Sequence, residues 1–234
     1  MWLEFKEATQ EKECMDGTDL SPTFLRQNFK ELAFINRHLG GHQANISFLA
    51  QKLKKLPIQQ SVSVLEVGCG GSDNLGALQR FFEQKGLSFK GTGVDLLDKA
   101  IEVSRENYPE MDFYHQDFWD FKAPQKYDFV MANLFFHHIP HDVIPKFIHR
   151  MLEMSRYGVL INDLHRHYLA YSSIKLLTKL FSKCPYVVND APLSVRRSFV
   201  KKDWEKLLQH PLLKHQAFEI EWKWAFRYVV FVEK

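Results

Sequence analysis

The sequence predicts an α/β fold whose core is an open, mostly parallel sheet of seven strands. Short apolar runs alternate with helical segments between residues 61 and 163, and each run has the length of a strand that is covered on both faces. The first run ends in a glycine-rich turn, and two adjacent aromatic-rich runs close the chain. We therefore expect parallel strands with crossover helices and an antiparallel C-terminal hairpin, preceded by a helical N-terminal extension.

Composition indicates a globular protein with one α/β domain and an accessory segment. A length of 234 residues is too short for two large domains, and a hydrophobic fraction of 45% allows a full core. The 31 Lys and Arg residues nearly balance 28 Asp and Glu residues, so a nucleic-acid partner is disfavoured. No apolar stretch reaches the roughly 18 to 20 residues of a membrane span.

The cysteines and the N-terminus suggest a cytoplasmic protein. Cys14, Cys69 and Cys184 are far apart, which favours neither a disulfide framework nor a cysteine-based zinc site. Charges alternate over residues 1–13, which argues against a secretory signal. A reducing compartment is therefore expected.

Residues 1–60 are predicted to form a helical extension. Ser21-Pro22 is a typical helix start and Gly40-Gly41 a typical stop, and a second helix is expected over residues 42–55. This extension is interpreted either as a lid over a ligand cleft or as simple packing on the sheet.

Residues 61–234 are predicted to form the main domain. Its expected strands are 62–67, 89–95, 111–115, 127–133 and 158–162, and its expected helices are 74–85, 99–107 and 142–156. Ligands of such sheets bind at the carboxyl ends of the strands. One rim is therefore expected to carry the residues Gly68, Asp95, Asp117, Asn133 and Asp163.

The regular alternation breaks after the fifth strand. We interpret residues 164–216 as a substrate-facing insertion, with a helix over 168–181, a loop through Pro185 and Pro192, and a helix over 202–209. The runs 218–225 and 227–233 then form the antiparallel pair at the sheet edge.

The most informative motif is Glu66-Val-Gly-Cys-Gly-Gly-Ser72, which directly follows the first apolar run. A strand that opens into a glycine turn lets backbone N–H groups approach a nucleoside ligand closely. Asp95 ends the second run, where its carboxylate can accept hydrogen bonds from ribose hydroxyls. Together these features predict an enzyme with a nucleoside cofactor.

Four segments in this order resemble the class I S-adenosylmethionine-dependent methyltransferases, in particular their small-molecule branch that includes the quinone-biosynthesis type. They are Leu65 to Gly70, Gly93-Val94-Asp95, Gln116-Asp117-Phe118, and Tyr127 to Val130 with Leu134 to His138. The resemblance covers about residues 61 to 163. It implies a Rossmann-like fold and S-adenosyl-L-methionine as cofactor.

The resemblance also implies roles for single residues. Glu66 and the glycines would contact the methionine part of the cofactor, Asp95 the ribose, and Asp117 and Phe118 the adenine. The complete set of implied cofactor-binding residues is Glu66, Gly68, Cys69, Gly70, Asp95, Leu96, Asp117, Phe118 and Asn133.

One position departs from the family pattern, because Ser72 stands where the family has a third glycine. We expect the small side chain to admit the turn, and Ser72 or Asp73 to cap the following helix. A nicotinamide dinucleotide enzyme is the competing interpretation. It would require the spacing G-x-G-x-x-G, and the carboxylate of Glu66 would repel a pyrophosphate but suits a cationic amino group.

The function expected from these features is methyl transfer to a small aromatic, phenolic, quinone-like or polyketide-like acceptor, on oxygen or carbon. An RNA or protein methyltransferase is an alternative, although strand four lacks the Asn-Pro-Pro-Tyr motif of amino methylation. A non-catalytic, cofactor-binding adaptor is a second alternative. A homodimer is left open.

Two histidines are candidates for a general base that removes the acceptor's proton: His165, just past strand five, and His138, after strand four. Hydrogen bonding in a turn or a solvated loop is the alternative for each, and for His137. A metal is not expected, since Asp163 with Asp142 or Asn162 has only a generic spacing. Arg196 and Arg197 are interpreted as an anion site or, more simply, as ion-pair partners.

Overall fold

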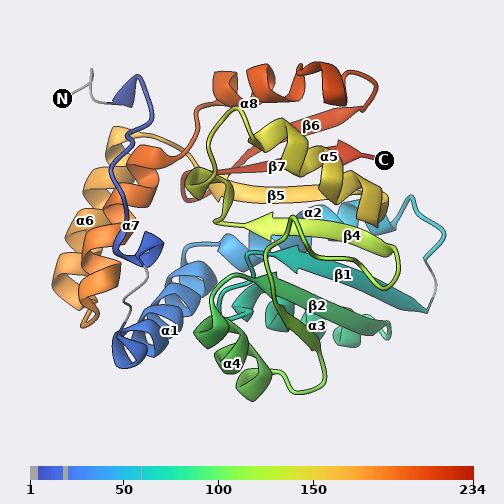
Figure 1. Ribbon diagram of the computed structural model, residues 1–234, viewed down its shortest axis with the longest axis horizontal. Helices are drawn as coiled ribbons and strands as arrows, with labels where there is room; N and C mark the ends of the chain where they lie inside the picture. Colours follow the sequence, from blue (N-terminus) through green and yellow to red (C-terminus); the bar gives the residue numbers. More distant parts are fainter. Residues whose placement is uncertain (1–4, 18–20, 59) are drawn as a thin grey trace.

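A seven-stranded sheet runs through the centre of the computed structural model, which describes residues 5–17, 21–58 and 60–234 (Figure 1). The order across the sheet is β3-β2-β1-β4-β5-β7-β6. The strands are β1 (Ser61–Val67), β2 (Ser88–Asp95), β3 (Asp112–His115), β4 (Tyr127–Asn133), β5 (Ser155–Leu164), β6 (Phe218–Lys223) and β7 (Arg227–Glu233). The first five are parallel, and β7 is antiparallel to both β5 and β6. The predicted fold class is confirmed.

Helices cover both faces of the sheet because successive strand residues point to opposite sides. In β4, Phe129 and Met131 belong to one core, while Val130 and Ala132 belong to the other. The first core is covered by α2 (Gly41–Leu53), α3 (Asp73–Gln84) and α4 (Asp98–Asn107). The second is covered by α5 (Ile144–Met154) and α8 (Lys201–Leu208). Both faces are thus apolar, as a parallel sheet requires.

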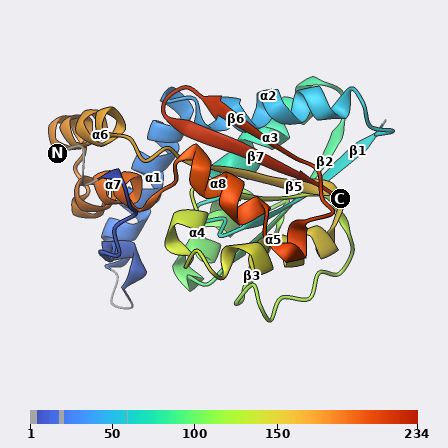
Figure 2. The ribbon, with the colours of Figure 1, turned by 90° about the horizontal axis from the view of Figure 1, so that it is seen from above.

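Three further helices gather beyond the carboxyl ends of the parallel strands. They are α1 (Pro22–His38), α6 (Tyr168–Phe181) and α7 (Pro185–Arg197), which lie together at the left of Figures 1 and 2. The helix α7 packs against both α1 and α6. Parts of the chain that are far apart in sequence, the N-terminal extension and the segment after β5, therefore cover the same end of the sheet.

The segment around Pro185 and Pro192 is a helix, and the predicted loop is wrong. Pro185 occupies the first helical position, where its missing N–H has no partner to lose. Pro192 costs one backbone hydrogen bond inside the helix, but Val187, Leu193 and Val195 are buried around it. Tertiary packing outweighs the local preference here.

The other boundaries shift by a few residues. The fifth strand was expected over 158–162 but extends over Ser155–Leu164, because Asp163 and Leu164 pair with β7 and Ser155 pairs with Tyr127 of β4. The helix expected over 142–156 is shorter, Ile144–Met154. Within the described ranges, none of the helices is long and apolar enough to cross a membrane.

Candidate functional site

The turn after β1 is shaped for close approach of backbone to a ligand. Gly68 and Gly70 have φ values of 65° and 52°, in the left-handed region that favours glycine. A Cβ atom on Gly68 would lie 2.2 Å from the ring of Phe135, so a side chain there has no room. The backbone N–H of Gly70 donates to Asp95 Oδ2 at 2.8 Å. The tip of β2 therefore holds the turn in place.

Two buried carboxylates flank this turn. Burial raises the pKa of Asp95, although both of its oxygens accept backbone N–H groups, from Gly70 at 2.8 Å and Leu97 at 2.9 Å. Burial also raises the pKa of Glu66 well above its usual value, and the nearby Asp73 adds to the effect. Oε1 of Glu66 accepts from Asn74 at 3.0 Å, whereas its buried Oε2 has no hydrogen-bond partner.

Ser72 begins α3 in a left-handed conformation, with φ of 58°. Its hydroxyl pairs with the hydroxyl of Ser104 at 2.8 Å and makes no helix-capping bond, so the predicted cap is wrong. Asp73 instead lies 2.6 Å from His42 Nε2 and accepts from Asn36 at 3.3 Å. Contacts from α4 and from the N-terminal helices have replaced the local cap.

The turn opens into a cavity of about 1000 Å³. All nine residues predicted to bind the cofactor line it, and they come from the ends of the first four strands and the loops that follow them. They are Glu66, Gly68, Cys69, Gly70, Asp95, Leu96, Asp117, Phe118 and Asn133. Of the five residues expected along the rim, Gly68, Asp95, Asp117 and Asn133 line this cavity, whereas Asp163 is not among its lining residues.

The far side of the cavity is lined mainly by apolar side chains of α1, α6 and α7. They include Phe29, Leu32, Ile35, Ile174, Leu177, Val187 and Val195. Helices from both accessory segments thus line the same cavity.

The two histidines predicted as catalytic residues lie in different places. His138 lines the cavity. His165 lies outside this lining, with its ring against Tyr228 and His167, and its Nδ1 accepts from Trp222 Nε1 at 3.3 Å. Burial, together with the charges of His167 and Arg166, lowers the pKa of His165 to about 4. The structure does not bring the two residues together.

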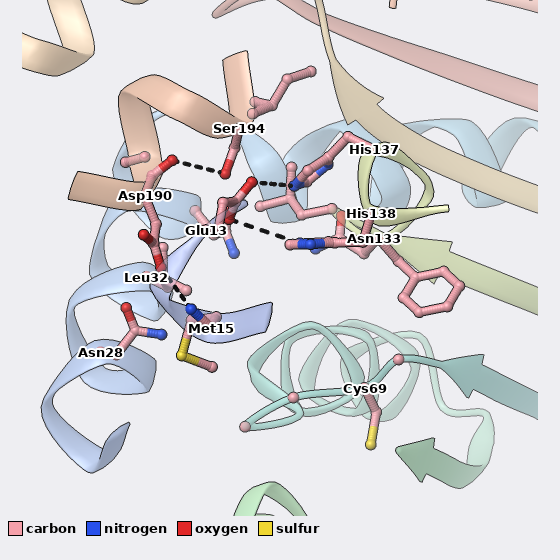
Figure 3. Close-up of a pocket in the computed structure, with 18 of the residues that line it drawn as sticks. Glu13, Met15, Asn28, Leu32, Cys69, Asn133, His137, His138, Asp190 and Ser194 are labelled. Atoms are coloured by element: carbon pink, nitrogen blue, oxygen red, sulfur yellow. Dashed lines mark hydrogen bonds and ion pairs between the residues drawn. The ribbon is translucent and has the colours of Figure 1, made fainter. Parts of the chain in front are cut away.

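One side of the cavity is lined by three ionisable residues, which we call the polar wall: Glu13, His137 and His138 (Figure 3). His137 Nε2 lies 3.8 Å from Glu13 Oε1, and His138 Nε2 lies 3.9 Å from Glu13 Oε2. Burial raises the pKa of Glu13 to about 7. The carboxylate comes from the N-terminal segment and the two rings from the turn after β4.

Each ring of the polar wall is fixed from behind by an aspartate. His137 Nδ1 lies 2.7 Å from Asp163 Oδ1, and His138 Nδ1 lies 2.9 Å from Asp16 Oδ1. Burial alone would raise the pKa of Asp163, but the ring of His137 holds it below its usual value. For Asp16, burial likewise acts to raise the pKa, but hydrogen bonds from His138 and Arg197 outweigh it and lower the pKa below its usual value. Asp163, considered in the sequence as an oxygen ligand, instead orients a histidine.

Arg196 and Arg197 have carboxylate partners within the chain. Arg196 lies 2.9 Å from Glu11, and Arg197 pairs with Asp16 and lies 3.6 Å from Glu13. Of the two interpretations considered, ion pairing is the one found. These pairs tie the C-terminal end of α7 to the N-terminal segment.

Comparison with known proteins identifies the domain. Residues 64–158 match the family model described as "Methyltransferase domain", and this range contains the glycine turn, both flanking carboxylates and the two histidines of the polar wall. The match covers less than half of the chain and assigns this range to a methyltransferase domain. Methyltransferases of this family use S-adenosylmethionine as cofactor, so the match supports the cofactor expected from the sequence and gives no support to the dinucleotide alternative.

Solved structures share the fold of this methyltransferase domain at low sequence identity. The plantazolicin methyltransferase BpumL, in complex with S-adenosylhomocysteine (SAH), is 18% identical with a TM-score of 0.66, covering 89% of this chain and 87% of its own. The magnesium protoporphyrin IX methyltransferase from Synechocystis PCC 6803 is 13% identical with a TM-score of 0.55, covering 84% and 83%. A SAM-dependent methyltransferase from Aquifex aeolicus is 13% identical with a TM-score of 0.59, covering 92% and 99%. No curated protein sequence matches the chain.

The buried polar atoms of the methyltransferase fit the charges of the methyl donor. The methionine part carries an ammonium and a carboxylate, and the unpaired Oε2 of Glu66 suits the ammonium. Arg227 is fully buried, lines the cavity, and leaves Nε and Nη1 without hydrogen-bond partners. Burial lowers the pKa of Arg227 to about 10, so the guanidinium stays charged and suits the carboxylate.

Residues of the N-terminal helices that sequence reasoning missed complete this part of the site. Asn45 of α2 donates to Asn74 at 2.7 Å and to Asn133 at 3.2 Å, which links the turn after β1 to the end of β4. Asn36 of α1 accepts from Arg227 at 3.0 Å. In the sequence, only the polar side chains of Asn36 and Asn45 within amphipathic helices could have indicated these roles. Their contacts join distant parts of the chain, which sequence spacing does not reveal.

Proposed function

We propose that this methyltransferase acts on a small, largely apolar acceptor of aromatic, phenolic, quinone-like or polyketide-like type, on oxygen or carbon. The observation that carries the proposal is the cavity itself. It joins the donor-binding turn, the apolar faces of α1, α6 and α7, and the polar wall in one space.

The size of the cavity supports two ligands side by side. A volume of about 1000 Å³ is at the upper end of the range of roughly 300 to 1000 Å³ for small-molecule sites. The structural relatives include methyltransferases named for plantazolicin, magnesium protoporphyrin IX and the citrinin polyketide synthase. The three cysteines are free, which suits a reducing compartment, and we propose that the protein is cytoplasmic.

The chain's own residues have three tasks in this proposal. The donor supplies a methyl group on a positively charged sulfur. Glu66, Asp95 and Arg227 fix the donor, and the apolar helices align the acceptor and exclude water. The polar wall promotes loss of the acceptor's proton, which makes His138 the proposed catalytic histidine, because His165 lies outside the cavity lining.

The accessory segments act as the cover of the cavity in this proposal. Residues 1–60 contribute α1 and residues 164–216 contribute α6 and α7. These helices line the apolar side of the cavity and limit how closely a folded protein or a structured RNA can approach the polar wall. This arrangement favours a small acceptor over a macromolecular one.

The test uses donor with a labelled methyl group, purified protein and a soluble cell extract separated into small-molecule, protein and RNA fractions. We expect label in the small-molecule fraction only. A folded Asp95→Asn variant serves as control, and its donor affinity should fall about 10- to 100-fold because it loses a charged acceptor. Label in RNA or protein would contradict the proposed acceptor class. Donor binding without transfer to any fraction would favour the adaptor.

A further inference from the structure

The polar wall places two imidazole nitrogens opposite one carboxylate. The three ligand-type atoms, one each from Glu13, His137 and His138, lie within 4.8 Å of one another (Figure 3). The separations of 3.8 and 3.9 Å between the rings and the carboxylate are too long for hydrogen bonds. Atoms that bind one ion at about 2.0 to 2.2 Å lie about 3 to 4 Å apart, so small side-chain movements suffice to close around an ion.

Asp163 and Asp16, which contact the two rings from the side opposite Glu13, determine which nitrogen of each histidine carries the proton and which one has a free lone pair. Asp163 Oδ1 lies 2.7 Å from His137 Nδ1 and Asp16 Oδ1 lies 2.9 Å from His138 Nδ1, so each carboxylate accepts the Nδ1 proton of its ring. The lone pair that can bind a ligand is then on Nε2, the ring nitrogen that lies nearer to Glu13. An aspartate, a histidine and an ion in line is the usual arrangement of metal sites in proteins.

The environment of the Glu13 carboxylate independently supports a ligand between it and the two rings. Its residue is only 6% exposed, and Oε1 is buried without a hydrogen-bond partner. Two ring lone pairs and an unpaired carboxylate oxygen therefore face one another in a buried region, an arrangement that a cation between them would stabilise.

The surrounding charge also favours a cation. Arg197 is the guanidinium near Glu13, at 3.6 Å, but it pairs with Asp16 and donates to the backbone carbonyl of His137. Three carboxylates surround the two histidine rings: Asp16 and Asp163 contact them, and Glu13 lies opposite them. The positive charge of Arg197 offsets the negative charge of only one of the three. The site retains net negative charge.

We propose that Glu13, His137 and His138 form a binding site for one divalent transition-metal ion, with Zn²⁺ as the best match. Two imidazoles and one carboxylate suit zinc or its first-row neighbours, whereas Mg²⁺ and Ca²⁺ prefer oxygen ligands. Three protein ligands leave at least one coordination position open toward the cavity, as in catalytic zinc sites.

The catalytic consequence rests on the proposed function. An acceptor hydroxyl that occupies the open position releases its proton to water more readily, because the ion stabilises the electron pair that stays on the oxygen. This would explain why the polar wall lies in the same cavity as the donor-binding turn. An acceptor that presents an oxygen to the polar wall is therefore favoured over one that presents only carbon.

The experiment measures metal binding directly. Full-length protein is stripped with a chelator, Zn²⁺ is titrated by competition with a chromophoric chelator, and Co²⁺ is added separately for its visible spectrum. We expect one ion per chain. The variants Glu13→Gln and His138→Gln should each lose at least about 100-fold in affinity, because loss of even a supporting residue costs about 10- to 100-fold. His149→Gln serves as matched control, since His149 is an exposed histidine on α5 that pairs with Glu153, and its affinity should be unchanged.

SAH binding, measured on the same samples, separates this inference from the proposed function. Variants that still bind SAH are folded at the donor site. The inference is overturned if the wild type holds no ion, or if Glu13→Gln and His138→Gln bind Zn²⁺ as tightly as the wild type. SAH binding without metal binding would refute only the metal site, whereas metal binding without SAH binding would refute the proposed function.

Discussion

At the scale of single residues, Arg227 has the most unusual environment in the candidate site. It is buried, charged, and bonded through Nη2 to Asn36, while two of its other nitrogens have no partner. Leaving such donors unpaired costs free energy, typically about 1 to 3 kcal/mol per group. A ligand carboxylate would remove this cost, which explains why a donor with a carboxylate end fits the cavity.

The variant Arg227→Met tests this explanation. We expect donor affinity to fall about 10- to 100-fold, because a charge-assisted bond is lost. The melting temperature of the ligand-free protein should stay the same or rise, since the variant removes a buried charge with unpaired donors. Calorimetry with SAH and thermal unfolding provide the two measurements. Arg26→Met, at an exposed arginine paired with Glu106, is the matched control and should change neither. Unaltered SAH affinity in Arg227→Met would refute the assignment.

His165 provides a prediction about pH. Its pKa in the folded protein is about 4, below the ordinary value of 6.5. Between these two values the unfolded chain binds the proton and the folded protein does not, so stability falls as the pH falls through this window. The melting temperature of the wild type should therefore drop more steeply from pH 6.5 to 4 than that of His165→Gln. Parallel curves for the two proteins would contradict the lowered pKa of the half-buried His165.

The residues that could be predicted from the sequence are those that follow the ends of strands. Glu66, Gly68 and Asp95 belong to short motifs whose position in an α/β sheet determines where they lie. Glu13 and Arg227 belong to no such motif. They reach the cavity through tertiary contacts across most of the length of the chain, which neither spacing nor periodicity encodes.

At the scale of elements, the N-terminal segment depends on α7 for its position. Both oxygens of Asp190 accept backbone N–H groups of this segment, from Cys14 at 2.8 Å and from Met15 at 3.0 Å. These bonds hold Glu13 against the two histidines. The helix α7, where the sequence had predicted a loop, thereby positions Glu13, one of the three residues of the polar wall.

The variant Asp190→Ala tests this dependence. Loss of two bonds to a carboxylate, each worth about 1.5 to 3 kcal/mol, should release the N-terminal segment. We expect faster cleavage within residues 5–17 by added protease and faster amide exchange at residues 14 and 15, with donor affinity retained. Glu11→Gln, which removes an exposed ion pair of the same segment with Arg196, should have little effect. An equally protected segment in Asp190→Ala would show that other contacts position Glu13.

The elements were predictable where local pattern and tertiary packing agree. The helix Tyr168–Phe181 and the strand Tyr127–Asn133 have the predicted boundaries. The helix α7 was not predictable, because proline at two positions indicates a loop locally while buried apolar residues stabilise a helix. The extension of the fifth strand likewise depends on pairing with β7, which lies far along the chain.

At the scale of the whole molecule, the fold brings three separate parts of the chain to one end of the sheet. The ends of β1, β2 and β4 line one side of the cavity, which we propose binds the donor, and helices from the N-terminal extension and from the segment after β5 line the other, which we propose binds the acceptor. The family motifs lie in the first part, and the features that would distinguish one acceptor from another lie in the other two. The sequence therefore indicated the cofactor more clearly than the acceptor.

The central claim is that donor and acceptor share this cavity, with the polar wall beside the transferred methyl group. A crystal structure of the protein with SAH tests it most directly. We expect the nucleoside beside Asp95 and Asp117, and the sulfur in the part of the cavity that faces His137 and His138. A structure in which SAH lies outside the cavity, or in which its sulfur points away from the polar wall, would contradict the account.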